Sequence, residues 1–324
     1  MADTFMTLFP VGARDIWRPL GAFTDQIQEI RIRLNKPVIV VKNDGEWFLK
    51  KEGLTKESRQ AIVIEEPEMN RYLNHFCQDS IYAFQDELKN GFITVPGGHR
   101  VGVAGQVMLE QGEVVGMKYI TCINIRVTHQ IKGVANSIMP LLYEKGKLQN
   151  TLIVSPPGCG KTTLLRDMVR QISDGNNWGE GMPVSVIDER SEIAGCYLGI
   201  PQNDVGIRTD VLDGCPKEKG MMLMLRSMSP KVVAVDELGG MEDLKSVFHL
   251  SFCGCKVIAT VHGEDIQQLR YKEGWERILG TGLFGRIVVL GKRSGMPEII
   301  GVYDKEMKRL GEVNAKDMKI CFDC

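Results

Sequence analysis

The stretch TLIVSPPGCGKTTLLRDM, from Thr151 to Met168, contains an apolar run, a turn rich in Gly and Pro, and the start of a helical pattern. A strand, a glycine-bearing loop and a helix in this order are typical of a phosphate-binding loop, in which backbone N–H groups and the helix N-terminus face a phosphate. Ser155 stands where the G-x-x-x-x-G-K-[ST] pattern has its first Gly. Because Pro156-Pro157 can turn the chain there with fixed φ angles, we expect the loop to hold a nucleotide nonetheless.

The residues nearest to a bound phosphate are intact in this loop. Gly158 and Gly160 stand where the backbone must approach the phosphates closely. Lys161 would reach the β- and γ-phosphates, and the hydroxyl of Thr162 would bind Mg²⁺. We therefore expect ATP and Mg²⁺ as ligands. The expected nucleotide-binding residues of the loop are Ser155, Pro156, Pro157, Gly158, Cys159, Gly160, Lys161, Thr162 and Thr163.

Strand patterns alternate with helical patterns from this loop onward, which indicates a parallel sheet with crossover helices. The first four expected strands end in polar residues, at the edge where parallel α/β sheets bind their ligands. The expected strands are Thr151–Ser155, Val184–Asp188, Lys231–Glu237, Lys256–His262 and Arg286–Leu290.

The segment KVVAVDELGG, from Lys231 to Gly240, predicts a Walker B strand. Asp236 would hold Mg²⁺ through water, and Glu237 would polarise the attacking water as a general base. An acidic strand end without a special role is the alternative. A carboxylate pair at this place favours hydrolysis over a passive nucleotide switch.

The segment PVSVIDERSEIAG, from Pro183 to Gly195, places Asp188, Glu189 and Glu192 at the end of the strand that follows the phosphate-binding helix. We interpret them as a second acidic arm near Mg²⁺ and the γ-phosphate. On spacing alone, an ordinary acidic surface turn stays open as the alternative.

The segment KVIATVHGED, from Lys256 to Asp265, is a buried strand pattern that ends in Thr260-Val261-His262-Gly263. In P-loop ATPases with a catalytic Glu on the Walker B strand, the next strand lies between that strand and the P-loop strand. We therefore expect His262 near the γ-phosphate, where it could sense that phosphate, although a lone His is more often structural.

The chain before the loop has a different texture. The stretch Glu29–Leu49 alternates with period two around the turn signal Asn43-Asp44-Gly45 and predicts a hairpin. Helical periodicity over Glu65–Gly91 predicts one helix that ends on Gly. The stretch Phe92–His129 is punctuated by Gly and predicts short strands. These patterns predict an α+β domain.

The two domains should join near Ile131–Asn150, where IKGVANSIMPLLYEKGKLQN predicts an amphipathic helix followed by a polar turn. We assign residues 1–135 to a smaller N-terminal α+β domain and residues 136–324 to the P-loop domain.

The composition is that of an ordinary soluble globular protein of 324 residues with a formal net charge of −1. No apolar run reaches the roughly 18–20 residues that span a bilayer, and the start lacks a signal-peptide pattern. Scattered Lys and Arg give no electrostatic footprint for nucleic acid or anionic lipid. We expect a cytoplasmic protein.

The cysteines favour reduced thiols over disulfides or zinc. Their number, nine, is odd in a chain of this length. A zinc site would need a second pair at suitable spacing beside Cys253-Gly-Cys255 or Cys321-x-x-Cys324. We therefore predict no metal or redox role for either pair.

The order SPPGCGKTT, VIDERSE, QNDVG with LRSMSPKVVAVDE, and ATVHG resembles that of the secretion ATPase superfamily, which powers type II secretion, type IV pili and conjugation machines. Within it, the chain is similar to the stage III sporulation protein AA family of endospore formers. Three segments carry this resemblance in the first domain: EIRIRLNKPVIVV, SIYAFQDELKNGFITVPGGHRVGVAGQV and INIRVTHQI. It covers about residues 27 to 305.

The resemblance implies a RecA-like P-loop core and an ATPase of the mother cell, peripheral at a membrane-spanning channel to the forespore, whose assembly or transport it energises. It also implies a ring, expected as a hexamer, and membrane components of the channel as partners. Glu237 would be the catalytic carboxylate. The other expected functional residues are Lys161, Asp188, Glu189, Glu192, His262 and, from the first domain, Arg100 and Arg126.

Two features depart from the superfamily pattern. Secretion ATPases usually have Gly before the Walker B Glu, whereas this chain has Asp236, a potential Mg²⁺ ligand. The tetracysteine module of some relatives is absent from the sequence.

Two rival interpretations stay open. A nucleic-acid-dependent RecA-like ATPase would share the core, but the near-neutral charge and the lack of basic–aromatic clusters argue against it. A nucleotide-gated scaffold with little turnover is the other rival, and Glu237 argues against that one.

Overall fold

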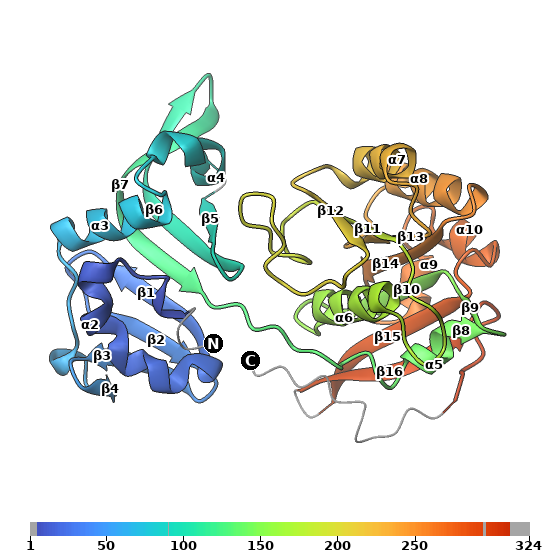
Figure 1. The fold of residues 1–324 in the computed structure, drawn as a ribbon, viewed down its shortest axis with the longest axis horizontal. Coiled ribbons are helices and arrows are strands. Elements are labelled where there is room, and N and C mark those ends of the chain that lie inside the picture. Colours follow the sequence, from blue (N-terminus) through green and yellow to red (C-terminus); the bar gives the residue numbers. More distant parts are fainter. Residues whose placement is uncertain (1–4, 90, 294–295, 312–324) are drawn as a thin grey trace. The chain divides into compact units, whose positions relative to one another are not determined.

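The computed structural model describes residues 5–89, 91–293 and 296–311. They form two compact units, drawn in Figure 1. The first holds residues 5–129 and also Gly195–Gln202, and the second holds residues 130–194 and 203–311. Within these described residues, the chain returns to the first unit at Gly195–Gln202, which no sequence pattern had predicted.

The first unit is built on a seven-stranded antiparallel sheet with the order β4-β3-β2-β1-β7-β6-β5. The predicted hairpin is confirmed, because Lys42 pairs with Gly45 across a turn at Asn43-Asp44. The strands are β1 Ile27–Arg33, β2 Ile39–Lys42, β3 Gly45–Lys50, β4 Gly53–Thr55, β5 Phe92–Val95, β6 His99–Glu110 and β7 Glu113–Arg126.

Two strands of this sheet are longer than the Gly-rich sequence had predicted. β6 and β7 pair from Arg100–Arg126 to Glu110–Glu113, with two register shifts on the way. A Cβ on Gly105 would lie 2.6 Å from the carbonyl oxygen of Tyr119, so glycine permits the strands to approach there. The glycines therefore shape a long hairpin and do not end its strands.

The single helix predicted over Glu65–Gly91 is wrong. The structure has α3 (Glu66–Phe76) and α4 (Gln85–Lys89), separated by Gln78 and Asp79 with φ values of 49° and 58°. Two left-handed residues in a row end a right-handed helix. The apolar periodicity continues because both helices cover the same core, in which Tyr72 and Leu88 are buried.

An aromatic cluster anchors the N-terminal part of the first unit. Phe9 stacks on Trp17 with ring centroids 4.1 Å apart, and the Trp17 indole N–H donates to the Tyr72 hydroxyl at 3.2 Å. All three side chains are fully buried, so the segment that contains α2 (Arg14–Trp17) belongs to the core of this unit.

The second unit is built on a seven-stranded sheet with the order β12-β11-β13-β14-β10-β15-β16. Neighbouring strands are parallel except for the last pair. β14 lies between β13 and β10. This confirms the prediction that the strand ending in His262 lies between the strand before Glu237 and the strand before the loop. The strands are β10 Thr151–Ser155, β11 Val184–Asp188, β12 Thr209–Asp213, β13 Val232–Val235, β14 Lys256–His262, β15 Arg286–Arg293 and β16 Met296–Asp304.

Helices cover this parallel sheet. Leu152 and Val154 of β10 share a core cluster with side chains of α7, α8 and α10, whereas Ile153 points to the opposite side, as alternation along a strand requires. The helices of this unit are α5 Met139–Leu142, α6 Lys161–Asp174, α7 Lys217–Ser227, α8 Met241–Phe252, α9 Ile266–Arg270 and α10 Trp275–Gly280. Over the described ranges, none is long and apolar enough to span a membrane.

The amphipathic helix predicted within Ile131–Asn150 is also wrong. Only α5 forms there, and a two-stranded hairpin of β8 (Tyr143–Glu144) and β9 (Lys147–Leu148) follows it. Lys145 and Gly146 both have positive φ, at 50° and 73°. Two such residues make the type I′ turn that joins closely paired antiparallel strands, so the chain forms a hairpin from Tyr143, which is extended directly after α5.

Candidate nucleotide-binding site

The loop between β10 and α6 has the backbone that a phosphate-binding loop needs. Gly158 and Gly160 have φ values of 67° and 76°, in the left-handed region that side chains disfavour. Ser155, in place of the first Gly, is fully buried and donates from Oγ to the Pro156 carbonyl at 2.8 Å. Its own carbonyl accepts the Gly263 N–H at 3.1 Å. Ser155, which stands where the motif has its first Gly, is therefore a buried and hydrogen-bonded part of the loop.

The donors at the start of α6 fit a polyphosphate. Gly160 is the N-cap residue, and within the described residues no side chain caps this helix start. The N–H groups of the first turn therefore remain available to an anion, which the helix dipole also favours. Lys161 is the first residue of α6.

Oxygen ligands suited to Mg²⁺ lie beside this loop. The Thr162 hydroxyl donates to Asp236 Oδ2 at 2.7 Å, and the Thr260 hydroxyl donates to the other oxygen of the same carboxylate. A carboxylate beside a hydroxyl at the end of a phosphate-binding loop is the kind of donor set that Mg²⁺ takes together with phosphate oxygens. Thr162 and Asp236 would therefore hold the ion.

Glu237 lies two residues beyond the end of β13 and faces three nitrogen-bearing side chains. Its Oε2 accepts a hydrogen bond from Arg190 Nη1 at 2.9 Å and lies 3.9 Å from Lys161 Nζ. Its Oε1 lies 2.9 Å from His262 Nε2, which in turn lies 3.1 Å from Lys161 Nζ. The predicted residues Lys161, Glu237 and His262 thus form one cluster, which Arg190 joins.

The backbone at Glu237 is strained. Its φ of 55° lies in the left-handed region, which costs a side-chain-bearing residue roughly 1–2 kcal/mol. Thr260 holds this conformation, because its hydroxyl accepts the Glu237 N–H at 2.8 Å and its carbonyl accepts the Leu238 N–H at 2.8 Å. Such strain is typical of residues that a fold holds in place for function.

The acidic turn after β11 is arranged differently. Asp188 is 2% exposed, and its carboxylate accepts the N–H groups of Glu192, Ile193 and Ala194 at 2.8, 3.0 and 2.8 Å. Burial raises the pKa of this carboxyl, although the hydrogen bonds oppose that shift. The side chain of Asp188 therefore anchors its own turn. A role of Asp188 in nucleotide binding stays a prediction.

The other acidic residues of this turn have separate surroundings. Glu189 forms an ion pair with Lys217, the first residue of α7, at 2.5 Å. Arg166 of α6 donates to the Glu192 carbonyl at 2.7 Å, which ties the turn to α6. The parts of Glu189 and Glu192 in binding or catalysis stay predictions.

Arg190 was not among the predicted site residues. Its guanidinium meets Glu237 across the edge of the sheet, because β11 and β13 are neighbours. One signal was available, since Arg190 is the cation within the acidic run DERSE. Because most arginines are solvated surface residues, that signal was weak.

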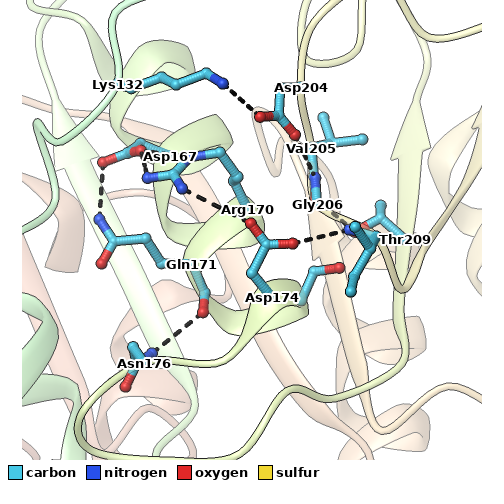
Figure 2. Close-up of polar contacts among 12 residues, drawn as sticks. Lys132, Asp167, Arg170, Gln171, Asp174, Asn176, Asp204, Val205, Gly206 and Thr209 are labelled. Atoms are coloured by element: carbon cyan, nitrogen blue, oxygen red, sulfur yellow. Dashed lines mark hydrogen bonds and ion pairs between the residues drawn. The ribbon is translucent and has the colours of Figure 1, made fainter.

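Asp204, Val205 and Gly206 of the QNDVG motif lie beside α6, as Figure 2 shows. Asp174 near the end of α6 accepts the Ile207 N–H at 2.9 Å. Asp204 of the motif accepts from the Gly206 N–H at 3.1 Å and pairs with Lys132 at 2.5 Å. The motif therefore forms a turn attached to α6 and to the segment that leaves the first unit.

A buried carboxylate completes this network. Asp167 of α6 is 2% exposed and accepts the Ala135 N–H at 2.9 Å (Figure 2 shows its side-chain partners). Arg170 and Gln171 donate to the same carboxylate at 2.7 and 3.0 Å. Because both carboxylate oxygens of Asp167 are engaged, this side chain fixes the segment around residue 135 to α6.

Arg100 and Arg126 lie in the first unit, where they are cross-strand partners on β6 and β7. The Arg100 guanidinium lies 3.9 Å from the ring centroid of Phe92. Arg126 is exposed. Their contact with nucleotide stays a prediction.

The cysteines show no metal site where the structure describes them. Over residues 5–89, 91–293 and 296–311, no group of three or more His, Cys, Asp or Glu side chains could hold a metal ion by itself. Cys255 is buried and its thiol donates to the Pro230 carbonyl at 3.1 Å, whereas Cys253 is exposed. Cys321 and Cys324 lie outside the described residues.

Solved structures share this fold. The ATPase DotB of Legionella pneumophila aligns with a TM-score of 0.53 at 17% identity, over 87% of this chain and 76% of that chain. The pilus retraction motor PilT, solved with bound ADP, aligns with a TM-score of 0.55 at 14% identity, over 90% of this chain and 81% of that chain. The predicted fold class, α/β with a RecA-like core built on a parallel sheet, is therefore confirmed.

Sequence comparison is more specific. Stage III sporulation protein AA of Bacillus subtilis (strain 168) is 41% identical over 281 residues, which cover 87% of this chain and 88% of that protein. The family model described as Sporulation stage III, protein AA matches residues 4–310. The predicted resemblance is thereby confirmed, and the chain belongs to the sporulation stage III protein AA family.

Proposed function

We propose that this chain hydrolyses ATP to ADP and phosphate. The observation that carries the proposal is the position of Glu237, which lies 3.9 Å from Lys161 and directly follows the Asp236 that pairs with Thr162. A carboxylate at this place can accept a proton from the water that attacks a phosphate, and it can pair with the cations that bind that phosphate.

The reaction needs little covalent chemistry from the protein. Glu237 accepts a proton from water as the water oxygen attacks the γ-phosphorus, and the bond from that phosphorus to the β–γ bridging oxygen breaks. Lys161 and the N–H groups at the start of α6 stabilise the charge on the phosphate oxygens. Thr162 and Asp236 would hold Mg²⁺, which would supply positive charge to the phosphate oxygens.

The biological setting of the proposal comes from the relatives. The chain would act as a motor in the mother cell, peripheral at a channel to the forespore, and would energise assembly or transport. Its partners would be membrane components of that channel. The name of PilT, a pilus retraction motor, supports force generation on this fold.

The working form would be a ring, expected as a hexamer. Arg100 and Arg126 would then reach a nucleotide, their own or a neighbour's. In the transition state, a positive guanidinium would stabilise the charge of the γ-phosphate.

The test combines mass in solution, with and without MgATP, with ATPase activity as a function of protein concentration. We expect turnover per chain to rise with assembly, and Lys161→Ala to abolish nucleotide binding and turnover together. Lys245→Gln, on the exposed part of α8, is the control and should behave as wild type. ATP turnover that persists in Lys161→Ala would sink the proposal.

A further inference from the structure

Both oxygens of Glu237 are engaged in the structure. Arg190 at 2.9 Å and Lys161 at 3.9 Å lie on Oε2, and His262 at 2.9 Å lies on Oε1. A general base must instead offer an oxygen to water within hydrogen-bond reach. Each oxygen thus has one close nitrogen partner, and release of Arg190 would open Oε2 to a water molecule while His262 stays at Oε1.

Arg190 is the partner best able to move. Its side chain is 64% exposed, whereas that of Lys161 is 10% exposed. The backbone beneath it is fixed, because Asp188 binds the following N–H groups and the Ser191 hydroxyl donates to Asp213 at 2.6 Å. A long, exposed side chain on a fixed turn can change partners without any change of fold.

A terminal phosphate would compete with Glu237 for this guanidinium. It offers several anionic oxygens where one carboxylate offers two, and Arg binds phosphate with two parallel hydrogen bonds. Lys161, next to Arg190 on the same Glu237 oxygen, is the residue that would reach the β- and γ-phosphates. A terminal phosphate that binds Lys161 would therefore also lie within reach of Arg190.

We propose that Arg190 is a positioning residue that reads the γ-phosphate: it holds Glu237 through Oε2, and it transfers to the terminal phosphate when a nucleoside triphosphate binds. The transfer leaves Oε2 free to face water. A diphosphate lacks the phosphate that draws Arg190 away, so Glu237 stays held. The inference rests on the proposed function and adds to it a means of telling ATP from ADP.

The test is binding of MgATP and MgADP to the full chain, measured by calorimetry for wild type and Arg190→Gln. We expect the variant to bind ATP about tenfold more weakly, a loss of about 1.4 kcal/mol, and to bind ADP within about twofold of wild type. Arg190→Lys should recover part of the ATP affinity, because it keeps the charge but lacks the two parallel donors. Arg18→Gln, at an exposed arginine that lies 3.7 Å from Asp15, is the matched control.

A double-mutant cycle sharpens the test. Glu237→Gln removes the anion that competes for Arg190, so this variant should bind ATP several-fold more tightly than wild type. The gain should vanish in Glu237→Gln/Arg190→Gln, because the two residues act on one another.

The outcomes separate the two proposals. Equal losses of ATP and ADP affinity in Arg190→Gln, or additive effects in the cycle, would overturn the role of Arg190 alone. A wild-type chain that binds neither nucleotide would overturn the proposed function, and this inference with it.

Discussion

The neighbouring strands β11 and β13 end at the same edge of the parallel sheet, and each is followed by carboxylates with different partners. Asp188 is 2% exposed and accepts three backbone N–H groups. Glu237 is 29% exposed and faces the side chains of Arg190, Lys161 and His262. Backbone donors cannot leave without unfolding their turn, whereas side-chain donors can change partners. We therefore expect the two carboxylates to differ in role, Asp188 in stability and Glu237 in turnover.

The largest expected effect tests Glu237, the carboxylate whose side-chain partners can change. Glu237→Gln keeps the shape of the side chain but removes the base, so turnover should fall about 1,000-fold while ATP still binds. Steady-state ATPase assays measure the loss, and urea unfolding should show a change in stability below about 1 kcal/mol. Glu242→Gln, at an exposed residue of α8, is the control. Turnover at the wild-type level in Glu237→Gln would contradict the assigned role.

The next largest effect tests Asp188, the carboxylate whose partners are fixed backbone N–H groups. Asp188→Ala leaves three N–H groups of the turn without their acceptor, so the free energy of unfolding should fall by about 3 kcal/mol. Urea unfolding measures it, with Asp15→Ala at an exposed residue as the control. Asp188→Asn should lose less, because burial raises the pKa of this carboxyl and disfavours its charged form. A fall in turnover without a fall in stability would place Asp188 with Glu237 instead.

The sequence could predict much of the second unit because its signals are local. A buried parallel strand is a continuous apolar run, and β10, β11 and β14 agree with their predicted bounds. β12 was not predicted, since its sequence TDVLD carries three polar residues among five. The position of Glu237 in the sequence predicted that β14 lies between β13 and β10. This strand order brings His262 close to Lys161 and Glu237.

The failures have physical causes as well. The segments at residues 65–91 and 131–150 keep apolar periodicity through their breaks, although Gln78 and Asp79 have positive φ and Tyr143 is already extended. Neither α3 nor α5 has a Gly or Pro directly after its last residue, so periodicity did not reveal where they end. Arg190 was missed because its partner lies 47 residues away and is brought near by sheet order alone. Long-range pairing of common charged residues cannot be read from a single sequence.

The comparison of fixed and exchangeable partners extends to two histidines. His99 is buried, and its Nδ1 accepts the Thr128 N–H at 3.0 Å. Burial, with a smaller contribution from His129, lowers the pKa of His99 to about 4. His262 instead faces the side chains of Glu237 and Lys161. We expect His99 to affect stability and His262 to affect turnover.

The effect of His99 should appear as a dependence of stability on pH. Its folded pKa lies below its ordinary value of 6.5, so the unfolded chain binds more protons between pH 6.5 and 4. Stability is therefore lost as pH falls through this window, by about 2 kcal/mol from this group between pH 7.5 and pH 5. Urea unfolding at the two pH values measures the difference. His99→Gln, which keeps an acceptor for Thr128, should remove it, and an unchanged difference would assign the pH dependence to other groups.

The smallest expected effect concerns His262. Its Nε2 lies between Glu237 and Lys161, while its Nδ1 is buried without a hydrogen-bond partner in the described part of the chain. A ring held on one side only can turn as its neighbours change partners. His262→Ala should therefore bind ATP within about threefold of wild type but turn over roughly tenfold more slowly, since a tenfold change needs only about 1.4 kcal/mol of transition-state stabilisation. ATPase assays and calorimetry measure both quantities, with His249→Ala at an exposed residue of α8 as the control. If turnover and binding both stay at the wild-type level, His262 belongs with the structural histidines, and the exchangeable cluster reduces to Glu237, Lys161 and Arg190.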